Sequence, residues 1–133
     1  MTYMLDSNLS IALIRNKPPS VLHKLNEVKR DGIAISSITL AELEHGVAIS
    51  AHMQKNADAL AQILTFLDVL PFDAMAAYHY GLIRADLQRK SQLIGPLDML
   101  IAGQARATGL ILVTNNTREF SRVDGLILVD WMT

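Results

Sequence analysis

Four acidic side chains have the types and positions expected of a catalytic site. They are Asp6, Glu42, Asp98 and Glu119. The chain contains no Cys, and its four His are scattered, so a thiolate zinc site and a Cys nucleophile are excluded. Carboxylates without nearby His or Cys are the ligands that Mg²⁺ or Mn²⁺ prefers. Because such a cation activates water and neutralises a phosphodiester, the pattern predicts metal-dependent hydrolysis of that bond.

Two of these acids also have a purely structural explanation. Asp6 follows the predicted strand 3–5 and could simply cap the next helix. Glu119 could pair with Arg118 or Arg122 at the surface. Recurrence favours the functional interpretation, because oxygen-bearing side chains that follow the strands of a parallel sheet meet at one edge.

Glu42 and Asp98 lie near the starts of predicted helices, where a carboxylate also stabilises the positive helix end. Glu44 is two residues beyond Glu42, about 200° around the helix, so only one of the two can face a shared site. Asp98 is the third helical residue from Pro96, among apolar or small neighbours. A charge in such surroundings needs a partner or an ion.

The elements that must position these residues are predicted from hydrophobic patterning. Short apolar runs alternate with stretches of helical period, which indicates a parallel sheet flanked by helices. A long helix is expected from Ala74 to about Lys90, with Leu82 and Ile83 facing the core, and Pro96 opens another. The first strand is short and is expected to be central. Strands are predicted at 3–5, 33–36, 69–70, 111–114 and 127–129.

The charge balance excludes a strongly basic nucleic-acid binder. The 133 residues include 12 Lys and Arg and 13 Asp and Glu, for a formal net charge of -1. Any polyanion must therefore be held by metal ions or local basic clusters. No apolar run suits a membrane span or a signal peptide, so a cytoplasmic protein is expected. The clusters are Arg15, Lys17, Lys24, Lys29 and Arg30, and Arg84, Arg89 and Lys90.

Four ordered motifs resemble those of PIN-domain ribonucleases, specifically the VapC-type toxins of bacterial toxin–antitoxin modules. The resemblance spans essentially the whole chain and implies a single PIN domain over 1–133. Its fold would be a three-layer α/β/α domain around a mostly parallel central sheet. The matching segments are Met4 to Asn8, Ser36 to Leu43 followed by Gly46, Gly95 to Ala102, and Val113 to Phe120.

The resemblance also implies roles for individual residues. Mg²⁺ or Mn²⁺ would be held by Asp6, Glu42 and Asp98. Asn8 and Thr114 match positions that orient the acids.

Two positions depart from the usual family pattern. Ser7 stands where Thr is more usual, which keeps the hydroxyl. Asn116 stands where many PIN domains carry a fourth Asp. Glu119 would supply that catalytic carboxylate instead, while Asn116 could still coordinate or hydrogen-bond without adding a charge, so the resemblance leaves the number of metal ions open.

The family implies an endoribonuclease toxin that arrests translation, with tRNA as the expected substrate and initiator tRNA as one form of it. It further implies a homodimer and a cognate VapB-type antitoxin that blocks the site with its C-terminal segment. Operator DNA would be bound only through the antitoxin, and no membrane partner is expected.

Two other functions are compatible with parts of the pattern. A phosphatase of the haloacid-dehalogenase type also places an Asp after its first strand, but it needs a second Asp where Asn8 stands. A non-catalytic dimeric binding module would use the acids only as helix caps. That module predicts that metal neither binds nor matters.

Overall fold

The structure is a computed structural model that describes residues 2–15 and 19–131. Its sheet has five strands, all paired in parallel, in the order β3-β2-β1-β4-β5. The predicted strands are confirmed to within one residue at each end, and β1 is central as expected. The strands are β1 (Tyr3–Leu5), β2 (Ile33–Ser36), β3 (Asp68–Leu70), β4 (Ile111–Val113) and β5 (Leu128–Val129).

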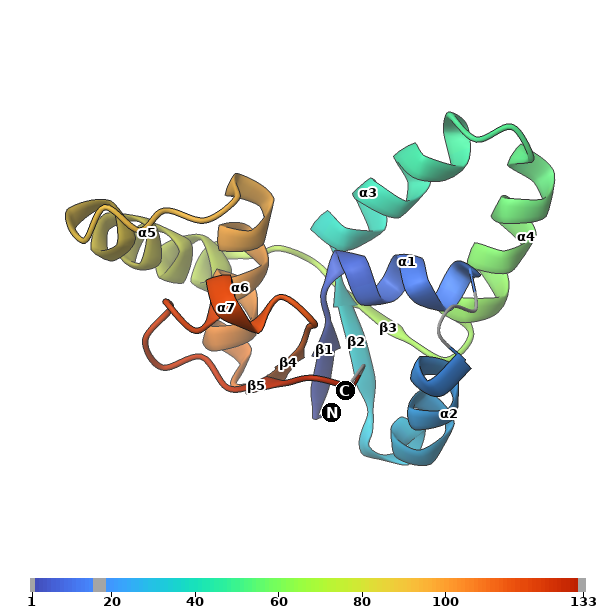
Figure 1. The fold of residues 1–133 in the computed structure, drawn as a ribbon, viewed down its shortest axis with the longest axis horizontal. Helices are drawn as coiled ribbons and strands as arrows, with labels where there is room; N and C mark the ends of the chain where they lie inside the picture. Colours follow the sequence, from blue (N-terminus) through green and yellow to red (C-terminus); the bar gives the residue numbers. More distant parts are fainter. Residues whose placement is uncertain (1, 16–18, 132–133) are drawn as a thin grey trace.

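Helices cover both faces of this sheet. Figure 1 shows α1 to α4 on one side of the strands and α5 to α7 on the other, which confirms the three-layer α/β/α architecture. No helix in the described part of the chain is long and apolar enough to cross a membrane. The helices are α1 (Ser7–Arg15), α2 (Pro19–Val28), the 3-10 helix η1 (Lys29–Asp31), α3 (Ser37–Ala48), α4 (Met53–Leu64), α5 (Ala74–Arg89), α6 (Pro96–Thr108) and α7 (Thr117–Phe120).

The sheet is buried on both faces because neighbouring strand residues point in opposite directions. Leu5 of β1 and Ile35 of β2 join the core beneath α1 to α4. Met4 and Ala34, one residue earlier in each strand, join the core beneath α5 to α7. All four side chains are fully buried, so β1 is fixed between two layers and its carboxyl end is held rigidly.

The bounds of the long helix α5 agree with the prediction. Of the two residues predicted to face the core, only Ile83 does so, and the prediction for Leu82 is wrong. Ile83 is 2% exposed, whereas Leu82 is 47% exposed. Adjacent helical residues point about 100° apart, so the two side chains face different surroundings. The two helices approach closely at Gly103, where an added Cβ would lie 2.8 Å from the backbone nitrogen of Tyr80.

The start of α6 is set by local chemistry that the sequence predicts. Pro96 is the first helical residue, and the backbone N–H of Met99 donates to the Gly95 carbonyl at 3.0 Å. Gly109 ends the helix with a φ of 73°, in the left-handed region that glycine favours. These signals place Asp98 in the first helical turn.

Candidate active site

Asp6 is the centre of the site, at the carboxyl end of the central strand. Its side chain is 2% exposed. One carboxylate oxygen accepts the backbone N–H of Leu9 at 2.9 Å, which is the predicted helix cap. The other accepts the hydroxyl of Thr114, just beyond β4, at 2.5 Å. Asp6 therefore caps α1 and presents a fixed carboxylate at the sheet edge.

The environment of Asp6 opposes its negative charge. Burial raises the pKa of Asp6, and the charge of Glu42 adds to that effect. The Thr114 hydroxyl and the backbone N–H groups of Leu9 and Asn8 act in the opposite direction and stabilise the carboxylate. The net effect is a raised pKa of Asp6, with burial as the largest cause.

Glu42 reaches the site from α3. It is the sixth residue of this helix, beyond the first turn, so the helix-start explanation is wrong for it. Its Oε1 accepts the Ser7 hydroxyl at 2.5 Å. Glu44 is exposed, so the two acids face different surroundings, as their angular separation predicts.

The pKa of Asp98 shows that the other three acids lie close enough for their charges to act on it. Its carboxylate is partly buried, and burial is the first cause that raises its pKa to about 6. The charges of Asp6, Glu119 and Glu42 raise it further, in that order. Within the described residues, no hydrogen-bond donor contacts the Asp98 carboxylate. Asp98 is therefore the acid whose charge is least compensated.

Glu119 is linked to Asp6 through the loop after β4. The side-chain nitrogen of Asn116 donates to Glu119 Oε2 at 3.2 Å, and its backbone N–H donates to Thr114 Oγ1 at 2.9 Å. Thr114 in turn donates to Asp6. Asn116 therefore joins Glu119 to Thr114 through two hydrogen bonds, while its role and that of Glu119 in the site stay predictions. Among the described residues, Glu119 forms no ion pair with Arg118 or Arg122.

Two residues of the first motif behave differently from expectation. Asn8 is exposed, and among the described residues it acts on Asp6 through its backbone N–H. The sequence predicts only that Ser7 keeps a hydroxyl, whereas in the structure this hydroxyl donates directly to Glu42. The sequence does contain a sign of this contact: Ser7 directly follows Asp6. Because Asp6 caps the helix, the Ser7 hydroxyl is free to bind another partner.

Comparison with known proteins agrees with this geometry. The sequence matches the PIN domain family over residues 3–126. The chain belongs to the PIN domain family. It is 47% identical to the tRNA(fMet)-specific endonuclease VapC of Shigella flexneri, over 98% of both chains.

Solved structures of VapC-type PIN domains have the same fold. The VapBC2 complex of Rickettsia felis bound to a promoter DNA fragment has a chain that superposes with a TM-score of 0.94 and 40% identity. The alignment covers 98% of this chain and 99% of the other. DNA-bound VapBC from Salmonella typhimurium gives a TM-score of 0.93, with 42% identity and 98% coverage of both chains. Because the chain belongs to the PIN domain family, we no longer consider the phosphatase of the haloacid-dehalogenase type.

The donors of this PIN domain fit a hydrated divalent cation. No Lys or Arg within residues 2–15 and 19–131 forms an ion pair with any of the four acids. In the same residues, no three His, Asp or Glu side chains form a group that could hold a metal ion. Mg²⁺ is commonly held by one or two carboxylates and keeps several waters. Carboxylate donors of this kind suit a hydrated divalent cation better than a cation that needs a closed protein cage.

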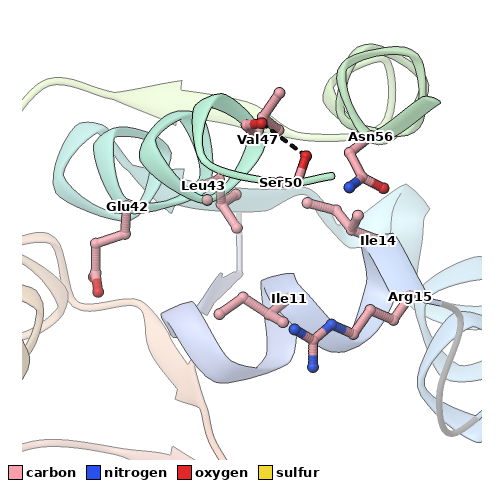
Figure 2. Close-up of a pocket in the computed structure, with 9 residues that line it drawn as sticks. Ile11, Ile14, Arg15, Glu42, Leu43, Val47, Ser50 and Asn56 are labelled. Carbon is pink, nitrogen blue, oxygen red and sulfur yellow. Dashed lines mark hydrogen bonds between the residues drawn. The ribbon is translucent and has the colours of Figure 1, made fainter. Parts of the chain in front are cut away.

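A groove of about 180 Å³ runs from this site between α1, α3 and α4 (Figure 2). Its walls are largely apolar, and Glu42 is the one acid of the site that lines it. Figure 2 shows Glu42 well apart from Asn56 of α4. The groove thus extends from Glu42 along α1 and α3 to α4. Its lining residues are Ile11, Ile14, Arg15, Glu42, Leu43, Gly46, Val47, Ser50 and Asn56.

Proposed function

We propose that this PIN domain, residues 1–133, is a divalent-cation-dependent endoribonuclease and the toxin of a VapBC-type toxin–antitoxin pair. One observation carries the proposal: the charges of three other acids act on Asp98, while no basic side chain in the described residues offsets them. A cluster of acids lowers the stability of the folded protein, because like charges repel. A cation bound among the acids would offset this repulsion and also the negative charge of an RNA phosphate.

The residues of the chain divide the work of the site. Mg²⁺ or Mn²⁺, when bound, supplies an activated water and offsets the phosphodiester charge. Asp6, Glu42 and Asp98 would hold the cation, with Glu119 as the further catalytic carboxylate. Thr114 fixes Asp6 in advance, so its orientation does not depend on the cation.

The proposed substrate is RNA. Among RNAs, tRNA is preferred because the Shigella flexneri relative is a tRNA(fMet)-specific endonuclease. Without the four acids of the site, the rest of the chain carries more basic than acidic residues. Some basic residues are already engaged: Lys24 pairs with Glu27, and Lys90 pairs with Asp86. Lys17 lies outside the described residues. Arg15, in the groove beside the site, is the best placed to contact a phosphate.

The function is tested by incubating purified protein with labelled initiator tRNA, an elongator tRNA and an unstructured RNA. We expect cleavage with Mg²⁺ or Mn²⁺, loss of cleavage in EDTA and recovery when the cation is restored, because the acids need a cation to act on a phosphate. An Asp98→Asn preparation purified in parallel controls for contaminating nucleases. A folded protein that cleaves none of these RNAs with either cation would support the non-catalytic binding module instead.

We propose that a segment of the antitoxin occupies the groove and covers Glu42. The related structures are VapBC complexes, and the groove offers apolar walls that end at a catalytic carboxylate. An apolar segment with a basic residue at the Glu42 end would bury the walls and neutralise that carboxylate. It would thereby exclude RNA from the site.

Gly46 allows a direct test, because an added Cβ there meets nothing within 4 Å. We expect expression of the protein to arrest growth and the antitoxin encoded beside it to relieve the arrest. Gly46→Trp would fill the groove and keep arresting growth when the antitoxin is co-expressed, whereas the matched Gly46→Ala would be neutralised. Equal neutralisation of both variants would place the antitoxin elsewhere.

We propose that the outward face of α5 forms the homodimer contact. Met75, Tyr78 and Leu82 follow one another at helical spacing and are 56%, 60% and 47% exposed. We expect this face to pack against the same face of a second copy of the chain. An antiparallel pair of α5 helices places the acidic residue at the start of the helix, Asp73, opposite Arg84 of the partner.

Leu82→Arg is expected to convert the dimer to a monomer, because it places two charges in an apolar contact about a two-fold axis. Light scattering after size-exclusion chromatography measures the mass. Ile127→Arg is the matched control, since Ile127 is 56% exposed and lies before β5, outside the α5 face. A wild-type monomer, or a Leu82→Arg dimer as strong as the control, would rule out this interface.

A further inference from the structure

The hydroxyl of Ser7 connects two of the elements that build the site. Ser7 is the first residue of α1, follows Asp6 directly and is 8% exposed. Its Oγ donates to Glu42 Oε1 at 2.5 Å. Its Oγ also lies 3.5 Å from the Thr39 hydroxyl of the same helix α3. A hydroxyl has one proton to donate, so the short contact identifies Glu42 as its acceptor.

The helix does not need this hydroxyl. Ser at a helix start usually caps the helix by accepting a backbone N–H. Here the carboxylate of Asp6 already accepts the N–H of Leu9, and the Asp6 carbonyl accepts both the N–H and the hydroxyl of Ser10. The first turn is therefore satisfied without Ser7, and its hydroxyl is available to a distant partner.

The side chain of Glu42, in contrast, needs a contact that holds it in one conformation. Its long side chain loses rotamer freedom when it is held in one place, and one side of it lines the open groove. Ser7 supplies its one side-chain hydrogen bond among the described residues. Because Ser7 and Asp6 are adjacent in the chain, this bond fixes Glu42 relative to Asp6 rather than relative to α3 alone.

We propose that Ser7 is a positioning residue of the ribonuclease site, which acts through Glu42 and does not touch the substrate. The inference rests on the proposed function. The hydroxyl holds the Glu42 carboxylate where it can share a cation with Asp6, and so lowers the conformational cost of assembling the site. A residue that only tied α1 to α3 would influence stability alone.

A matched pair of variants separates the hydroxyl from its bulk. Ser7→Thr keeps the hydroxyl, and Ser7→Val has the same shape as the Thr variant without it. We expect Ser7→Val to need about 10-fold to 100-fold more Mg²⁺ than Ser7→Thr for half-maximal binding, measured by calorimetry without RNA. We also expect a lower kcat for RNA cleavage with little change in KM, and near wild-type values for Ser7→Thr.

A double-mutant cycle with Glu42→Gln tests whether Ser7 acts through Glu42. If it does, Ser7→Val will add little to the loss already caused by Glu42→Gln. Equal Mg²⁺ binding and kcat in the Val and Thr variants would overturn the proposal, even if the Val variant unfolds more easily. A wild-type protein that neither binds Mg²⁺ nor cleaves RNA would instead overturn the proposed function, and with it this inference.

Discussion

Asp98→Asn is expected to abolish RNA cleavage, with a rate about 100-fold or more below that of the wild type. The substitution keeps the size of the side chain and removes one of the charges that face the cation and the phosphate. Because Asp98 accepts no hydrogen bond in the described part of the chain, little of the surrounding structure depends on it. Single-turnover cleavage of labelled RNA at saturating Mg²⁺ measures the loss.

The same variant is expected to be more stable than the wild type when no cation is present. The pKa of Asp98 is raised to about 6, so ionisation of this group costs more in the folded state than in the unfolded state. Its contribution therefore favours the fold at low pH and is lost as the pH rises from about 4 to 6. Allowing for solvent screening at a partly exposed carboxylate, the expected gain at pH 7.5 is about 1 kcal/mol.

Urea unfolding at pH 4 and pH 7.5 in EDTA checks this stability prediction. The gain should appear at the higher pH and shrink at the lower one, and added Mg²⁺ should stabilise only the wild type strongly. Asp31→Asn, at an exposed position, controls for the change in net charge. Undiminished cleavage by well-folded Asp98→Asn protein would refute the proposed mechanism.

Glu42→Gln is expected to lower cleavage by about 100-fold, whereas Glu44→Gln should stay within about twofold of the wild type. The two residues share one helix and one chemical type, but only Glu42 contacts Ser7 and acts on Asp6 and Asp98. Gln can still accept the Ser7 hydroxyl, so the substitution tests the charge rather than the contact. Cleavage rates and Mg²⁺ midpoints, measured side by side, provide the comparison.

The Glu44 variant is the internal control for this experiment. Its side chain is exposed, so its loss should change neither binding nor stability appreciably. Equal losses in both variants would mean that the charge of α3 as a whole matters and that Glu42 has no special place. Equal retention of activity would remove Glu42 from the proposed cation site.

The sequence alone determined the sheet and singled out the four acids that are proposed for the site. A short, fully apolar run such as the one ending at Val113 is typical of a strand buried on both faces, and Pro96 marks a helix start because its ring fits that position. These signals are local, so reading a few neighbouring residues is enough. The same reasoning separated Glu42 from Glu44, since helical periodicity sets their angle.

Only the tertiary structure decided how these residues cooperate. Thr114 and Asp6 are 108 positions apart, and Ser7 and Glu42 are 35 apart, yet each pair is joined by a hydrogen bond. Leu82 is a large apolar residue of the kind found in protein cores, yet it is 47% exposed. Periodicity gives the direction of a side chain on its own element. The partner it meets depends on how separate elements pack, which no local pattern specifies.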